Sequence, residues 1–543
     1  MAPTDRMGAD PVRSTPQSQT REANEVMAAM VEAGQIPPVV GSGPARPAEG
    51  EEAPGLDLVR RLCQALSTEA VDYCHWKSNE ALDRSARAES DLDLLVSRRH
   101  AHRFEEIIRG LGFKDGRPPS KKQLPGVFHS YGLDQASGKV VHLHVHYQLV
   151  LGDDMTKNYR LPLEEAYLES ARQGLLFRVP APEFEFVVFV LRMVLKHSTW
   201  DAILTHKGSL SAGEARELRY LSDRAGAEAA RGVVRDHLPF VGPDLWERCR
   251  RCLEPGTSRS FQFWTAHRLE RSLAAQARRS PGFDPFVRVW RRGQVAFRRH
   301  ILHRRPTRSR LDNGGALIAV VGGDGAGKST AVDEVYRWLS NDLDVVRIHL
   351  GKPPRSATSA VVHGAWRGGI RGVSHSRSAS AHQPTALPDG DRIDTRALVK
   401  LIRKVMTSRD RYLSYVRARR FASKGGIVVS DRFPIPQIML MDGPATAGLP
   451  RLRDRSKVVE FLAGLEARYY GKITSPDVLI VLRVHPDVAV QRRHGSEGAD
   501  FVHRRAEEVW RLDWSGIPAT VIDASRPKDE VLAQVKSAIW EGL

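Results

Sequence analysis

The chain of 543 residues has few of the features that mark secreted or membrane proteins. Its four cysteines are too few for a disulfide framework in a chain of this length. Because no stretch approaches eighteen unbroken apolar residues, no membrane-spanning helix is expected. The N-terminal "MAPTDRMGADPVRSTPQSQTREANE" lacks the apolar core of a signal peptide. We therefore expect a cytoplasmic protein, and the length predicts two or three domains.

Two of the cysteines, Cys249 and Cys252, form a CxxC motif, but no second pair follows at zinc spacing. We interpret them as two helix residues rather than as a metal or redox site. Acidic residues are also in the minority, and the formal net charge is +18. This charge suits polyanionic partners, such as nucleotides, nucleic acid or an anionic membrane, without choosing among them.

Changes in composition divide the chain into four parts. Residues 1–53 are rich in Pro, Ala, Gly and Glu and are predicted to be disordered. Short strands and helices alternate over 54–280, and an arginine-rich linker or helix, 281–314, follows. Residues 315–543 alternate buried strands with helices, which predicts a doubly wound α/β sheet. Within this part, 352–394 is expected to be a flexible insertion.

The last part opens with the strand "ALIAVVG" and the motif Gly322-x-x-x-x-Gly327-Lys328-Ser329, which has the full spacing of a phosphate-binding loop. An amphipathic helix follows, as this motif requires. Backbone N–H groups of such a loop hold phosphates, the lysine reaches the β and γ phosphates, and the serine ligates Mg²⁺. We therefore expect ATP and Mg²⁺ to bind at Gly322, Asp324, Gly325, Ala326, Gly327, Lys328, Ser329 and Thr330.

Further charged residues downstream suit phosphoryl transfer between two anionic partners. Asp431 and Arg432 end the buried strand "GIVVSD", at the sheet edge where α/β proteins bind ligands. The carboxylate is expected to hold Mg²⁺ and the arginine a second phosphate. Other arginines gather in two segments, at Arg409 and Arg411 and at Arg492, Arg493, Arg504 and Arg505. Each alone is an ordinary surface residue, but phosphoryl transfer needs such a supply of positive charge.

Four segments of the last part resemble thymidylate kinases in order and spacing: "GGDGAGKST", "SRDRYLSYVRARRFASKGGIVVSDRF", "PDVLIVLRVHPDVAVQRR" and "IDASRPKDEVLAQV". The resemblance covers about 315–543. It implies a P-loop NTPase fold and a nucleoside-monophosphate kinase. By the same resemblance Asp324 lies near the acceptor sugar, and Arg411 and Arg432 hold the acceptor phosphate. Arg492 or Arg493 stabilises the transferring group, and the loop 523–525 passes the adenine.

The chain departs from thymidylate kinases where those enzymes recognise the base. Gly351-Lys352-Pro353 replaces their Arg-Glu-Pro, and "QIMLMDGP" stands where a Tyr-Gln pair is expected. The lid segment lacks the Leu-Asp-Arg run. Phosphate chemistry is thus kept while base recognition is not, so the acceptor is either dTMP-like or a related phosphorylated molecule.

The first folded part has a different motif. Asp91 and Asp93 alternate on one strand, so both carboxylates face the same side. Such a pair binds Mg²⁺ in nucleotidyltransferases, and the pattern, with Ser90 before Asp-x-Asp, resembles small proteins of that α+β fold. The glycine that usually precedes the serine is Glu89, and the later strand "VVHLHVHYQLVLG" offers histidines instead of a third acid.

Two interpretations of this motif stay open. In one, the strand edge carries two solvated aspartates and three exposed histidines, His142, His144 and His146. In the other, His144 replaces the third acid and the site prefers an ion softer than Mg²⁺. Lys77 would then lie beside the site and hold a phosphate.

The arginine-rich segment 287–310 interleaves Trp290 and Phe297 with its basic residues. It is either a solvated helix between domains or a surface for nucleic acid or anionic lipid. For the whole chain three hypotheses follow: an ATP-dependent kinase of a phosphorylated acceptor, a nucleotide-binding switch or scaffold without turnover, or a nucleotidyltransferase acting in the first domain. A homodimer is compatible with each.

Overall fold

The computed structural model describes residues 55–120, 123–124, 126–199, 202, 209–301, 308–356, 359, 395–436, 438, 443–446, 456–493 and 498–543. They belong to one compact unit that starts at residue 53. The predicted disordered segment 1–53 and most of the predicted insertion 352–394 lie outside the described residues. The same holds for 494–497 of the lid and for most of "QIMLMDGP".

A six-stranded mixed sheet forms the first part, in the order β1-β2-β5-β4-β3-β10. Its strands are β1 (Tyr73–His75), β2 (Leu92–Val96), β3 (Lys114–Arg117), β4 (Val127–Leu133), β5 (Val140–His146) and β10 (Arg310–Leu311). The pair β2 and β5 is parallel, and Asp93 lies opposite His144 in its register. The other neighbouring strands are antiparallel. The edge strand β10 comes from the segment that the sequence assigns to the linker.

The two faces of this sheet have different chemistry, because side chains alternate along each strand. One face is apolar and packs against α2 (Asp57–Thr68) and α4 (Ala101–Gly110); its residues include Leu92, Leu94, Val96, Val141, Leu143 and Val145. The residues between them, Asp93 on β2 and His142, His144 and His146 on β5, therefore lie on the other face. The apolar face fixes the register, since a shift by one residue would expose it.

Helices make up most of the segment that follows. They are α5 (Glu164–Glu169), α6 (Pro182–His197), α8 (Ala212–Arg224), α9 (Ala227–His237), α10 (Pro243–Cys252), α11 (Arg259–Ser272) and α12 (Asp284–His300). The apolar helix α6 lies at the centre of their core. Cys249 and Cys252 are buried in α10 as free thiols, which confirms their interpretation as helix residues. Smaller elements are α3 (Leu82–Ala86) and the strand pairs β6 (Leu149–Leu151) with β7 (Tyr159–Leu161) and β8 (Arg172–Gln173) with β9 (Arg178–Val179).

The last part is built on a five-stranded sheet in the order β12-β13-β11-β14-β15, and all of its strands run parallel. The strands are β11 (Leu317–Gly322), β12 (Val345–His349), β13 (Ile427–Asp431), β14 (Val478–Arg483) and β15 (Thr520–Asp523). Strands β11, β13 and β14 are almost wholly buried, as their apolar runs predict. This is the mixed α/β architecture compatible with a P-loop NTPase.

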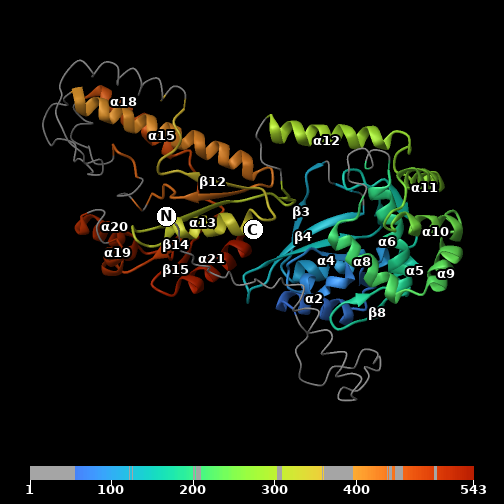
Figure 1. Cartoon of the computed structure of the whole chain (residues 1–543). Helices are drawn as coiled ribbons and strands as arrows, with labels where there is room; N and C mark the ends of the chain where they lie inside the picture. The colour runs from blue at the N-terminus through green and yellow to red at the C-terminus, as the bar shows by residue number, and fades with distance from the viewer. Residues whose placement is uncertain are drawn as a thin grey trace, which may run out of the picture. The chain divides into compact units, whose positions relative to one another are not determined.

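Helices cover both faces of the parallel sheet (Figure 1). On one side lie α13 (Lys328–Leu339) and α21 (Lys528–Gly542), and on the other lies α15 (Thr395–Ala422), which packs against α18 (Lys457–Tyr470). The short helices α19 (Pro486–Arg492) and α20 (Ala499–Arg511) follow β14. Within the described part of the chain, every helix is too short or too polar to cross a bilayer.

Candidate functional site

The phosphate-loop motif lies between β11 and α13, at the carboxyl edge of the parallel sheet. The turn depends on glycine: Gly325 has φ +81°, and a Cβ there would lie 2.7 Å from the carbonyl oxygen of Ala489. Gly327, also at positive φ, is the N-cap of α13. The first turn of α13 therefore directs its free N–H groups and the positive end of its dipole at the loop, as an anion site requires.

Lys328 folds back over this loop. Its Nζ donates to the carbonyl oxygen of Gly323 at 2.6 Å and lies 4.0 Å from Oδ1 of Asp324. Burial lowers the pKa of Lys328 to about 8, and the charges of Arg432 and Arg493 act in the same direction against that of Asp324. The ammonium thus has a carbonyl partner that a phosphate oxygen could replace. Ala326 is buried within the loop, while Ser329 and Thr330 are exposed on the first turn of α13.

Basic side chains from two other elements contact Asp324. Nη1 of Arg505, on α20, donates to its Oδ2 at 2.8 Å, and Nη2 of Arg432 lies 3.6 Å from its Oδ1. Burial alone would raise the pKa of Asp324, but the hydrogen bond from Arg505 and the charges of Lys328 and Arg432 outweigh it and hold this pKa below its usual value. The loop thus contains an ionised, buried carboxylate surrounded by three basic side chains.

Two oxygen-bearing side chains near the loop fit a hard divalent cation. Oγ of Ser329 donates to Oδ2 of Asp431 at 3.2 Å, which joins the start of α13 to the end of β13. Nη2 of Arg347, on β12, lies 3.8 Å from the same carboxylate oxygen. A hydroxyl and a carboxylate at this separation match the oxygen ligands that Mg²⁺ takes from a protein, with phosphates and water completing the shell. The residues therefore fit the Mg²⁺ that the motif predicts.

Arg432 adopts a left-handed backbone conformation, with φ +67°. This conformation costs a non-glycine residue about 1–2 kcal/mol, and such residues concentrate at functional sites. Arg432 follows directly after β13, and its left-handed backbone places the half-buried guanidinium near Asp324. Arg432 is thus brought to the loop, as the sequence predicts.

The other predicted arginines have different surroundings. Arg411 is buried: its Nε donates to the carbonyl oxygen of Leu350 at 2.7 Å and its Nη2 to that of Gly351 at 3.4 Å. In this arrangement it holds the loop after β12. Nη1 of Arg492 donates to the carbonyl oxygen of Ala524 at 2.9 Å, in the loop predicted to pass the adenine. Arg493 is exposed and close enough for its charge to act on Lys328.

Sequence reasoning did not give Arg505 or Arg347 a specific place. Arg505 was one of several arginines near the lid, and it reaches Asp324 across 181 residues of sequence. Arg347 alternates with apolar residues on β12, and only its position at the carboxyl half of a strand hinted at the site.

The sheet of the first part holds a second group of polar side chains. Asp91 lies just before β2, is largely exposed and contacts Nδ1 of His142 at 2.8 Å. Asp93 is buried, and its Oδ1 contacts Nδ1 of His144 at 2.9 Å and Nζ of Lys77 at 2.8 Å. His146 is buried as well. The alternative of solvated aspartates and exposed histidines is therefore wrong for Asp93 and His146, because Lys77 and Trp76, which follow β1, contact them.

Burial sets the protonation of this group. It would raise the pKa of Asp93, yet the charge of Lys77 and the hydrogen bond from His144, with His146 3.7 Å away, hold that pKa well below its usual value. Burial lowers the pKa of His146 to about 3, and it does the same to His129 on β4, which stacks on His144. At neutral pH the buried part of the face thus holds the ionised carboxylate of Asp93 and the neutral imidazoles of His129 and His146.

Three arginines of the predicted basic segment, Arg288, Arg291 and Arg292, point inward on α12. Arg288 is buried, and its Nε lies 3.5 Å from Oδ2 of Asp284. Nη2 of Arg292 pairs with Oδ2 of Asp153 at 2.5 Å, and Nη1 of Arg291 donates to the carbonyl oxygen of Met155 at 2.6 Å. Acidic and carbonyl groups of the same unit thus pair with the guanidinium groups of these three arginines.

Known proteins match about two-fifths of the chain, a share close to that of residues 315–543. No protein-family profile matches. An uncharacterized ATP-binding protein of Escherichia coli (strain K12), YghR, is 28% identical over 231 residues, which are 41% of this chain and 86% of that protein. A thymidylate kinase of Xanthomonas euvesicatoria is 28% identical over 242 residues (43% and 87%), and one of Halalkalibacterium halodurans is 25% identical over 250 residues (42% and 98%). With the geometry of the loop, these similarities support an ATP-binding, P-loop kinase-like region in this chain.

Proposed function

We propose that this protein is an ATP-dependent phosphotransferase whose acceptor is a nucleoside monophosphate or a related phosphorylated small molecule. The observation that carries the proposal is Asp324 with its cations. A site for ATP alone needs the loop, Lys328 and a magnesium ligand. Here Arg432 and Arg505 also converge from β13 and α20 on a carboxylate inside the loop, which supplies positive charge for a second phosphorylated partner.

In this proposal the residues divide between donor and acceptor. The loop 322–327 and the start of α13 bind the phosphates of ATP, and Ser329 and Asp431 hold Mg²⁺, which neutralises charge on the transferring group. Lys328 exchanges the carbonyl of Gly323 for a phosphate oxygen. Arg493 is the better placed of the two lid arginines to face the transferring phosphoryl group, since Arg492 is tied to Ala524.

On the acceptor side, Arg432 binds the acceptor phosphate and Asp324 contacts the adjoining hydroxyl groups. Arg411 acts as a positioning residue, because its donors hold the loop that begins at Leu350. That loop contains Gly351-Lys352-Pro353, where thymidylate kinases have the triplet that the sequence lacks. The part of the acceptor other than its phosphate is therefore recognised by different residues from those of thymidylate kinases.

The test is a screen of acceptors with the full chain, ATP and Mg²⁺, with ADP release as the measurement. The acceptors are dTMP, the other nucleoside monophosphates and a set of sugar phosphates, and Lys328→Met is the matched control. We expect one acceptor class to raise ADP release at least about tenfold over ATP alone, and the control to abolish this increase. If every acceptor leaves ADP release at background while ATP still binds, the protein is a nucleotide-binding switch and the proposal fails.

A further inference from the structure

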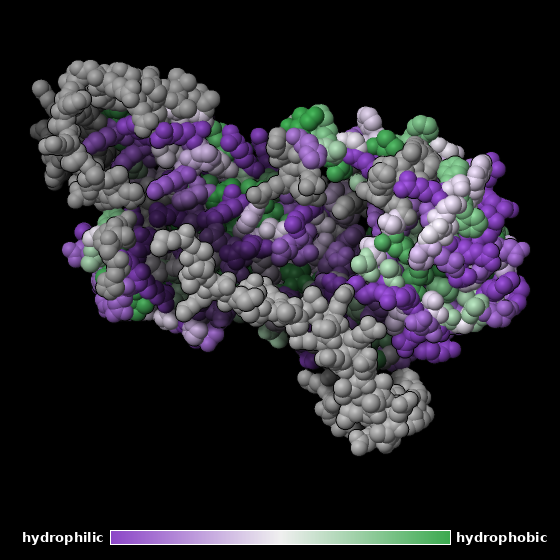
Figure 2. Space-filling view, in the orientation of Figure 1, coloured by the Kyte–Doolittle hydropathy of each residue, from purple (hydrophilic) through white to green (hydrophobic). Residues whose placement is uncertain are grey.

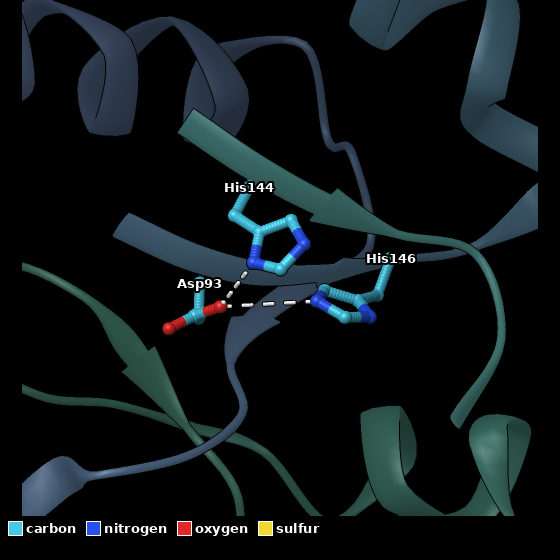
Figure 3. A group of neighbouring side chains, drawn as sticks. All are labelled: Asp93, His144 and His146. Carbon is cyan, nitrogen blue, oxygen red and sulfur yellow. Dashed lines mark hydrogen bonds and ion pairs between the residues drawn. The ribbon is translucent and has the colours of Figure 1, made fainter. Parts of the chain in front are cut away.

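The buried group Asp93, His144 and His146 lies apart from the phosphate loop, and the kinase function does not use it. One oxygen, Oδ1 of Asp93, faces both imidazoles: Nδ1 of His144 at 2.9 Å and Nε2 of His146 at 3.7 Å (Figure 3). The three ligand atoms lie within 4.8 Å of one another. Two ligands about 2.1 Å from a tetrahedral ion are about 3.4 Å apart, so these separations bracket those of a metal site.

A second observation points to a missing ligand. His146 is 6% exposed, and neither of its ring nitrogens makes a hydrogen bond to a described residue. Its Nε2 is directed at Asp93 (Figure 3). A buried polar group without a partner destabilises the folded protein, and an ion bound to Nε2 would remove that destabilisation.

We propose that Asp93, His144 and His146 form a binding site for a divalent transition-metal ion such as Zn²⁺ or Mn²⁺. Two imidazoles and one carboxylate favour such ions over Mg²⁺ and Ca²⁺, which prefer oxygen ligands. Three protein ligands leave coordination positions open. Lys77, whose Nζ lies 2.8 Å from Asp93, would supply a cation beside an anionic ligand of the metal.

Lys77 makes the proposal sharply testable. Its Nζ lies 2.8 Å from Oδ1 of Asp93, so in the metal-free protein the ammonium neutralises the carboxylate that the ion would bind. The lysine therefore competes with the metal. Lys77→Met should bind Zn²⁺ more tightly than the natural chain, whereas in a purely structural ion pair the same change would only leave Asp93 unpaired.

The experiment is equilibrium dialysis of the full chain, freed of metal by chelator, against Zn²⁺, Mn²⁺ or Mg²⁺ alone. We expect one Zn²⁺ or Mn²⁺ per chain and weaker binding of Mg²⁺. Asp93→Asn and His144→Ala should lower the affinity at least about 100-fold. The matched controls are Asp91→Asn and His142→Ala, which remove the neighbouring pair on the same face and should leave the affinity unchanged.

Three outcomes would overturn the proposal. They are absence of bound metal in both the natural chain and Lys77→Met, equal losses in the control and ligand variants, and tighter binding of Mg²⁺ than of Zn²⁺. Circular dichroism checks that each variant is folded. Kinase activity is not a readout here, so this result is independent of the acceptor screen.

A different observation carries a second inference, about α12. Arg288, Arg291 and Arg292 contact groups of the same unit, and Figure 2 shows hydrophobic surface where Figure 1 places α12. The exposed residues Phe283, Phe286, Trp290, Phe297 and Ile301 form one stripe at helical spacing. Phe286 and Trp290 are each 68% exposed. A stripe of this kind on a soluble surface marks an interaction site.

We infer that this stripe binds an anionic lipid surface. The chain carries a net charge of +18, which attracts it to an anionic bilayer and opposes pairing with a second copy. Trp and Phe favour the interface between lipid and water. Nucleic acid would need outward basic groups, whereas Arg288 and Arg292 are paired inside.

The test is co-sedimentation of the full chain with neutral phosphatidylcholine vesicles and with vesicles containing one-fifth phosphatidylglycerol. We expect binding to the anionic vesicles, and at least about a tenfold loss in the triple variant Phe286→Ser, Trp290→Ser, Phe297→Ser. The control is Phe461→Ser, which removes an equally exposed aromatic on α18. Absence of lipid binding would overturn the inference, as would a dimer or a nucleic-acid complex that the triple variant abolishes.

Discussion

Two substitutions of Arg432 separate the effect of its charge on activity from the effect of its backbone conformation on stability. Arg432→Ala and Arg432→Gly remove the same guanidinium group. They differ only in the Cβ atom, which at φ +67° strains alanine but not glycine. We therefore expect the two variants to lose the same activity and to differ in stability.

The magnitudes follow from the contacts. A hydrogen bond to a charged partner contributes about 1.5–3 kcal/mol, so both variants should lose about 10- to 150-fold in kcat/KM for the acceptor. ATP affinity should hardly change. The ion pair with Asp324 is long, at 3.6 Å, and Asp324 keeps Arg505, so its loss should cost less than about 1 kcal/mol. Arg432→Gly should be about 1 kcal/mol more stable than Arg432→Ala.

The assay combines steady-state kinetics, with the acceptor that the screen identifies, and urea unfolding of both variants. Unchanged kcat/KM in both would remove Arg432 from the acceptor site. A collapse of ATP binding would place the residue on the donor side instead. Equal unfolding free energies would show that its left-handed conformation carries no strain.

The remaining predictions concern protonation and backbone. Phosphates favour the ammonium form of Lys328, whose pKa is about 8 in the free site. The affinity for ATP, measured by calorimetry, should therefore fall by at most about tenfold per pH unit above pH 8. Lys328→Met should bind ATP weakly and without this pH dependence. Burial raises the pKa of Glu185 to about 8, whereas in the unfolded chain this carboxyl has its ordinary pKa of 4.5. The unfolding free energy measured in urea should therefore fall as the pH rises from 4.5 to 8, by at most about 1.4 kcal/mol per pH unit, and Glu185→Gln should remove that slope. Gly325→Ala should impair ATP binding far more than Gly327→Ala. A Cβ atom at Gly325 would lie 2.7 Å from the carbonyl oxygen of Ala489, whereas one at Gly327 would have no neighbour within 4 Å. Equal losses of ATP affinity would mean that only the positive φ matters at both positions.

Local patterns in the sequence determined much of the kinase-like region. The spacing from Gly322 to Ser329, a preceding apolar run and a following amphipathic helix predict the strand, loop and helix that the structure contains. The period of two placed Asp93 and the histidines of β5 on one face. These features depend on neighbouring residues, whose geometry is set by the backbone of a single element.

Only the tertiary structure decided which partners meet and which faces are covered. Arg505 reaches Asp324 because α20 packs beside the loop, and no short-range pattern records that contact. Lys77 and Asp93 meet through the pairing of β1 with β2. For α12 the sequence indicates an amphipathic helix but not its orientation. Glu270, Asp153 and the carbonyl group of Met155 contact its arginines from outside the helix, so the apolar side faces outward. Leaving a buried guanidinium without a partner costs more free energy than exposing an aromatic ring.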